Sequence, residues 1–127
     1  LKINILNLDK PGVLYLSICK DAAGFEETVE NESEEASCIT SAGEIELQNF
    51  EINGMIPHGE YAISLFIDSN GNKKIDKNFL GIPKEQYGFS NNVMGRMSAP
   101  TFDQAKFLVA GPTTQNIKLR IGIPKQD

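Results

Sequence analysis

The sequence predicts an all-β fold: a single antiparallel β-sandwich of about seven strands with one long loop. Short segments in which apolar and polar residues alternate recur along the chain, as strands with one buried face do. Gly, Pro and Asn separate these segments, which is typical of sandwich turns. No segment has convincing helical periodicity. With 127 residues, the chain is expected to form one domain over residues 1–127 that is large enough for its own core.

The first two predicted strands are residues 1–8 and 13–20, joined by a turn at Pro11-Gly12. Apolar residues occupy every second position in both, so one face of each strand is expected to be buried. Residues 21–35 follow as a polar loop with six glutamates, whose mutual repulsion favours an exposed segment. A short helical turn is the alternative there.

A strand pair is predicted over residues 36–41 and 44–52, with its turn at Ala42-Gly43. Residues 60–67 form the clearest strand of the chain, because four apolar side chains alternate strictly with smaller or outward-facing ones.

The remainder of the chain is predicted to hold one long loop and two closing strands. Residues 77–100 show no periodicity, and so long a loop in a small domain is usually functional or held in place by something. One closing strand is centred on Phe107 and Val109, and the other covers residues 117–123.

The charge of the chain is −5 and is unevenly distributed. Twelve acidic residues and no Lys or Arg lie between Asp21 and Asn72. Such a chain repels phosphate backbones, so nucleic-acid binding is not expected. No apolar run reaches the roughly 18–20 residues of a membrane span, so none is expected.

The two cysteines, Cys19 and Cys38, allow two interpretations. A disulfide between them would close a loop around the acidic segment and stabilise the fold by about 3 kcal/mol. Alternatively, both are free thiols buried in strands as small apolar residues. Two cysteines and one histidine are too few for a structural zinc site.

Residues 68–76 are the most distinctive stretch, because oxygen-bearing side chains recur there at alternate positions. Ca²⁺ takes oxygen ligands with this spacing in the EF-hand loop, although Lys73 and Phe79 replace the Gly and Glu of that pattern. We therefore predict a weak calcium site, with a dissociation constant on the order of 10⁻⁴–10⁻³ M. Its predicted ligands are Asp68, Asn70, Asn72, the Lys74 carbonyl and Asp76. The alternative is an Asx-rich loop that satisfies its own turns, with a hairpin turn at Asn70-Gly71.

A binding surface is predicted within residues 78–98, since Tyr and Asn on a rigid loop suit recognition of a protein, a peptide or a glycan. The predicted ligand-binding residues are Lys84, Glu85, Tyr87, Phe89, Asn91, Asn92 and Arg96. In the alternative interpretation, Phe79, Leu80, Phe89 and Met94 plug the open end of the sandwich. The amides of the same segment would then satisfy the loop backbone.

Three stretches of the sequence carry a resemblance to a known family. They are Asp68-Ser-Asn-Gly-Asn, Asn78-Phe-Leu-Gly-Ile-Pro-Lys-Glu and Tyr87-Gly-Phe-Ser-Asn-Asn. With the turn Pro57-His-Gly-Glu-Tyr-Ala before them, they resemble the bacterial family called domain of unknown function 2141. The resemblance implies a sandwich similar to transthyretin and carboxypeptidase regulatory-like domains, and a leader-directed extracytoplasmic protein with no known activity. His58 and Lys73 depart from the family pattern.

The leading functional hypothesis is a secreted or periplasmic binding or accessory module with a calcium-stabilised loop. The chain begins at Leu1 without Met, and we expect a mature form whose leader has been removed. The alternatives are a small hydrolase using carboxylates such as Glu85 or Asp103, and a purely structural cell-envelope protein. The residues do not favour catalysis, because the only histidine, His58, lies in a turn where exposure is expected.

Overall fold

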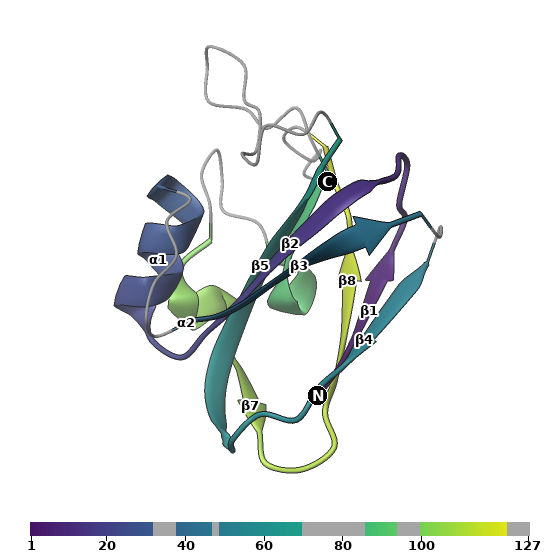
Figure 1. The fold of residues 1–127 in the computed structure, drawn as a ribbon. Coiled ribbons are helices and arrows are strands. Elements are labelled where there is room, and N and C mark those ends of the chain that lie inside the picture. The colour runs from purple at the N-terminus through teal and green to yellow at the C-terminus, as the bar shows by residue number, and fades with distance from the viewer. Residues whose placement is uncertain (32–37, 47–48, 70–85, 94–99, 122–127) are drawn as a thin grey trace.

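The chain folds into two β-sheets that face each other across a hydrophobic core, which confirms the predicted all-β sandwich (Figure 1). This computed structural model describes residues 1–31, 38–46, 49–69, 86–93 and 100–121. Eight strands lie in the described part of the chain, compared with the seven or so predicted.

The smaller sheet has three strands in the order β4-β1-β8. They are β1 (Lys2–Leu6), β4 (Phe50–Asn53) and β8 (Thr114–Lys118). Strand β1 pairs antiparallel with β4 and parallel with β8.

The larger sheet has five strands, with β3-β2-β5-β6 in order and β7 paired with the first residues of β5. They are β2 (Gly12–Cys19), β3 (Cys38–Ile45), β5 (Gly59–Asp68), β6 (Tyr87–Phe89) and β7 (Phe107–Val109). All pairs in this sheet are antiparallel.

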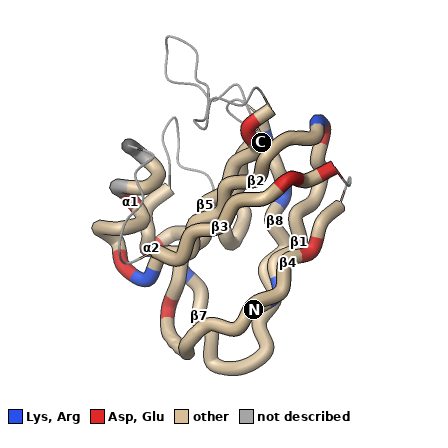
Figure 2. Tube along the Cα trace, viewed as in Figure 1, with Lys and Arg blue, Asp and Glu red and all other residues tan. Residues whose placement is uncertain are grey.

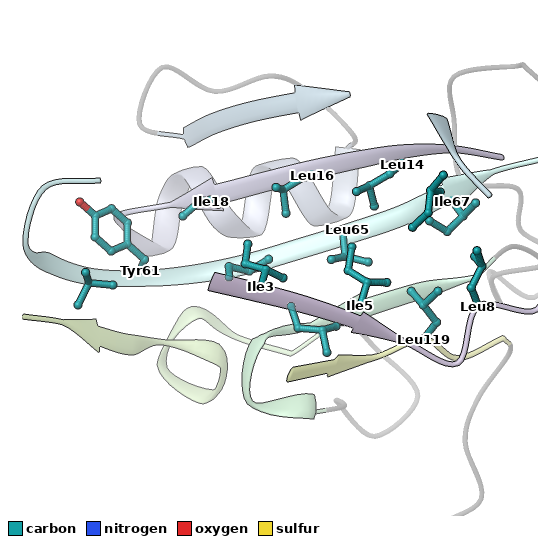
Figure 3. Close-up of a cluster of buried hydrophobic side chains, with 14 residues drawn as sticks. Ile3, Ile5, Leu8, Leu14, Leu16, Ile18, Tyr61, Leu65, Ile67 and Leu119 are labelled. Carbon is teal, nitrogen blue, oxygen red and sulfur yellow. The ribbon is translucent and has the colours of Figure 1, made fainter. Parts of the chain in front are cut away.

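The main core lies between the sheets and is built from the alternating apolar positions of their strands. Side chains from β1, β2 and β5, such as Ile5, Leu16 and Leu65, meet there (Figure 3). Each such side chain contributes about 1.5–3 kcal/mol on burial. A second, smaller cluster lies on the opposite face of the larger sheet, under helices α1 (Ala22–Asn31) and α2 (Phe102–Ala105). Its buried members are Cys19, Phe25, Ala62, Tyr87, Phe89 and Ala105.

The prediction of a polar loop over residues 21–35 was wrong, because α1 occupies most of that range. Two interactions explain the helix. The Asp21 carboxylate accepts a hydrogen bond from Gly24 N at 2.7 Å and so caps the first turn. Phe25 is fully buried, with edge-to-face contacts to Phe89 and Phe102 at centroid distances of 6.3 Å each.

The predicted turn at Ala42-Gly43 was also wrong. Strand β3 continues through these residues, which pair with Tyr15 and Leu14 of β2. The ladder with β2 extends over the whole length of β3, so the chain does not reverse before Ile45. The last strand ends at Lys118 instead of residue 123, and the predicted loop 77–100 contains β6 and the short 3₁₀ helix η1 (Ser90–Asn92).

A disulfide joins Cys19 of β2 to Cys38 of β3, directly across the ladder. The Thr28 hydroxyl of α1 lies 3.6 Å from Cys38 Sγ, so the bridge also contacts the helix. It therefore fixes the start of β3 against both β2 and α1.

Replacing both Cys19 and Cys38 with Ala is expected to lower the free energy of unfolding by about 3 kcal/mol, because the unfolded chain regains the freedom of the closed loop. Urea denaturation followed by circular dichroism measures the change. Dithiothreitol should lower the stability of the original protein and leave the double variant unchanged. Equal stability of the two proteins under oxidising conditions would contradict this role.

Gly88 of β6 is required by the close approach of β6 to β8. A Cβ at this position would lie 2.5 Å from Ile117 Cγ2 and 3.3 Å from the Lys118 carbonyl oxygen. Gly88→Ala is therefore expected to destabilise the protein by about 1–3 kcal/mol through overpacking, measured by chemical denaturation. Gly43→Ala in β3 is the matched control, since nothing lies within 4 Å of a Cβ there. If both substitutions changed the stability equally, backbone propensity and not packing would determine the loss of stability at Gly88.

Candidate functional site

The candidate site lies where β5 ends at Asp68 and where the described chain resumes at Gln86, and we call this meeting point the loop base. Ile67 N donates a hydrogen bond to the Gln86 carbonyl at 2.8 Å, which joins the two ends of the loop. The Gln86 side chain is buried, accepts from Asp9 N at 2.5 Å and donates to the Lys10 carbonyl at 2.9 Å. The loop base is thus attached to the turn between β1 and β2.

Asp68, the first predicted calcium ligand, is buried at this base with 2% of its surface exposed. It pairs with Val13 in the ladder, and a Cβ on the neighbouring Gly12 would lie 2.6 Å from the Asp68 carbonyl oxygen. The backbone on both sides of Asp68 is therefore closely packed. Because a buried carboxylate is costly unless its partners are in place, its position indicates a built polar environment at the end of β5.

The other predicted calcium ligands lie outside the described residues. They are Asn70, Asn72, Lys74 and Asp76. Within the described ranges, no group of three or more His, Cys, Asp or Glu side chains could hold a metal ion. The calcium site therefore stays a prediction for which the structure supplies the position of Asp68 alone.

An open surface depression lies beside the loop base. Its lining residues are Leu8, Asp9, Lys10, Pro11 and Glu46. Three of these side chains are charged, so the depression is polar in character and exposed to solvent.

The aromatic residues of the predicted binding surface are buried and not available for recognition in this structure. Tyr87 and Phe89 belong to the second core cluster, where their rings meet edge-to-face at 5.8 Å. Burial raises the pKa of the Tyr87 hydroxyl, and the nearby Arg120 guanidinium partly opposes the shift. Phe89 also meets Phe25 of α1 edge-to-face, so β6 contributes to the cluster under the helices. Lys84, Glu85 and Arg96 lie outside the described residues.

The two asparagines of the predicted surface, Asn91 and Asn92, hold the chain after β6 in place. Both have left-handed backbone angles, with φ of 61° and 53°, which Asn tolerates better than most residues. The Asn91 amide donates to the Lys106 carbonyl at 2.9 Å. Asn92 accepts from Lys118 N and donates to the Asn116 carbonyl, each at 2.8 Å. The two amides therefore bond to the backbone of β8 and of the chain before β7, and not to the backbone of their own loop as the alternative interpretation expected.

Ser90 is a structural residue that the sequence reasoning missed. It is fully buried; its hydroxyl accepts from Ile63 N at 2.8 Å and donates to the Ala105 carbonyl at 2.5 Å. It therefore links β5 to the end of α2. In the sequence, Ser90 stands out only as a small polar residue directly after Phe89.

Ser90→Ala is expected to lower the free energy of unfolding by about 2–4 kcal/mol, because each buried group left without a partner costs about 1–3 kcal/mol. Urea denaturation measures the change. Asn116→Ala is the control. The exposed side chain of Asn116 only accepts a hydrogen bond from Asn4 Nδ2 at 2.8 Å, so the loss of stability should stay within about 0.5 kcal/mol. A Ser90→Ala protein as stable as the original would show that both backbone groups find other partners.

Asp103, one of the carboxylates of the hydrolase alternative, lies in the first turn of α2. Its side chain is 86% exposed and lies 3.4 Å from Lys106 Nζ. It follows Thr101, whose side chain and Gln104 form a capping box at the start of α2. Hydrogen bonding to Asp103, together with the charge of Glu60, raises the pKa of Lys106. His58 is exposed, and Glu85 lies outside the described residues.

The comparison with family models agrees with the resemblance seen in the sequence. The family described as "Uncharacterized protein conserved in bacteria (DUF2141)" matches residues 3–118, and the chain belongs to this family. No curated protein and no solved structure matches the chain. None of the helices in the described ranges has the length and apolar character needed to cross a membrane.

Proposed function

We propose that this chain is an extracytoplasmic binding or accessory module whose loop after β5 is stabilised by a calcium ion. One observation carries the proposal: Asp68 is buried at a loop base that Gln86 holds closed. A ligand residue fixed in this way loses little conformational freedom when an ion binds, which favours binding.

The chemistry of the loop sequence supports calcium over other ions. Asp68, Asn70, Asn72 and Asp76 supply side-chain oxygens, and Lys74 supplies a carbonyl oxygen. Ca²⁺ accepts such mixed oxygen ligands in flexible geometry, whereas Mg²⁺ requires a near-ideal octahedron and keeps its waters. Bound calcium would hold the loop as one rigid surface on the sandwich.

The extracytoplasmic location is supported by the Cys19–Cys38 disulfide. Disulfides form and persist in oxidising compartments such as the periplasm and the cell exterior, and they are rare in the cytosol. A binding role is supported by the architecture, since a rigid sandwich that carries a long loop is a common arrangement for recognition. The partner would be a protein, a peptide or a glycan.

Calcium at 10 mM is expected to raise the Tm of this protein by roughly 5–10 °C. That concentration is about 10–100 times the dissociation constant expected for such a loop, which corresponds to about 1.4–2.7 kcal/mol of added stability. Differential scanning calorimetry in 10 mM CaCl₂ and in chelator measures the shift.

Magnesium chloride at the same concentration controls for ionic strength and should produce a much smaller shift. Asp76→Asn should reduce the calcium shift, and Asp103→Asn, which removes an exposed carboxylate outside the loop, should leave it unchanged. No shift, or one that magnesium reproduces, would rule out the calcium site.

A further inference from the structure

Strand β3 is an unusually long and exposed edge of the larger sheet. It has eight residues and β2 on one side only, whereas the other edge strands, β4, β6, β7 and β8, have four, three, three and five. The six residues from Ile39 to Glu44 are all exposed. In the described part of the chain, nothing pairs with the outer side of β3.

The register of the ladder shows which backbone groups face outward. The Cα atoms of Cys19 and Cys38 are 4.0 Å apart, the short spacing of a pair that exchanges no backbone hydrogen bonds. Such pairs alternate along an antiparallel ladder, so Thr40, Ala42 and Glu44 are of the same kind. Their N–H and C=O groups therefore point away from β2, toward the open edge.

Several devices that protect edge strands are missing from β3. Its sequence, Cys-Ile-Thr-Ser-Ala-Gly-Glu-Ile, holds no Lys and no Pro, and its eight pairs with β2 run without a bulge, so Glu44 is its one charged residue. The disulfide fixes its first residue, and Ile45 at its end is buried in the main core. The edge is thus both open and rigid, which is the condition for adding another strand with little loss of conformational freedom.

The charge around β3 selects the kind of strand that would fit. Its uncharged middle, Ile39–Gly43, is followed by exposed Glu44 and Glu46, which appear as red patches at the end of β3 in Figure 2. Glu34 and Glu35 precede it in the sequence, and no Lys or Arg occurs between Asp21 and Asn72. A second copy of β3 would bring no Lys or Arg to these glutamates, so the charge pattern does not favour self-pairing.

From this combination we infer that the free edge of β3 binds an extended peptide segment that has a short uncharged stretch and Lys or Arg beside Glu44 and Glu46. The segment adds to the sheet as a further strand, with backbone hydrogen bonds to Thr40, Ala42 and Glu44. The side chains on one face of the bound segment lie on the same face of the sheet as Ile39, which is 47% exposed and offers an apolar contact. This inference rests on the proposed binding role, names its partner class, and is independent of calcium.

The test uses a fluorescent, end-blocked peptide, Lys-Lys-Val-Thr-Val-Thr-Val-Lys-Lys, titrated with the whole protein at low salt and followed by anisotropy. Two matched peptides accompany it: one with Glu in place of every Lys, and one with methyl groups on the backbone nitrogens of one edge. The protein variant is Ala42→Pro, which removes an outward N–H that makes no bond to β2, and Ala42→Ser is its control.

Binding of the lysine peptide should weaken about tenfold or more with Ala42→Pro and with backbone methylation, because each removes hydrogen bonds of the added strand. Ala42→Ser should bind as the original protein does, and the glutamate peptide should bind at least about tenfold more weakly. Added salt should further weaken the binding of the lysine peptide to the protein.

Several results would overturn the inference: no binding, equal binding of the lysine and glutamate peptides, or binding that neither methylation nor Ala42→Pro reduces. If Ala42→Pro fails to fold by circular dichroism, the methylated peptide on the original protein decides the question. Sedimentation showing a dimer that Ala42→Pro disperses would assign the edge to a second copy instead. The titration is repeated in calcium and in chelator, so a failed calcium shift and a failed peptide titration are distinguished.

Discussion

Burial of β5 on both faces is the constraint on which the rest of this structure depends. One face of the strand supplies Tyr61, Ile63, Leu65 and Ile67 to the core between the sheets. The other face supplies Ala62 and Phe66 to the cluster under the helices. Strands β2, β6 and β7 all pair with β5, so both hydrophobic clusters and most of the larger sheet are organised around it. The candidate loop begins where this strand ends.

Polar side chains in the chain after β5 act mainly on the backbone of other segments. Gln86 holds the loop base, Ser90 links β5 to α2, and Asn92 joins η1 to β8. Among the described residues, no buried side-chain nitrogen or oxygen lacks a hydrogen-bond partner. Because a buried polar group is costly when unpaired, these contacts specify one path for the chain. They explain how residues 86–93, which have no hydrophobic periodicity of helix type, are fixed against β5, α2 and β8.

The two sides of the sandwich differ, and the difference separates structural from candidate binding surfaces. On one side, the Tyr87–Arg120 bridge and the hydrogen bonds of Asn92 connect the larger sheet to the chain around β8. On the other side lie the edges of β3 and β4, which no described strand extends. The first side is joined by backbone and side-chain hydrogen bonds, whereas on the second the described strands leave the outer backbone groups of β3 and β4 unpaired with any other strand.

The sequence alone determined the fold class and the strands β1, β2, β5 and β7, because strands with one buried face leave a local pattern of alternation. It also determined the family, through its motifs. Only the tertiary structure decided the rest. Helix α1 depends on the burial of Phe25 among distant aromatics, and β3 continues through Ala42 because β2 pairs with it. The roles of Ser90 and Asn92 likewise depend on segments far apart in the chain. Contacts between such segments leave no periodic signal in the sequence, so local patterns record burial but not which residues meet.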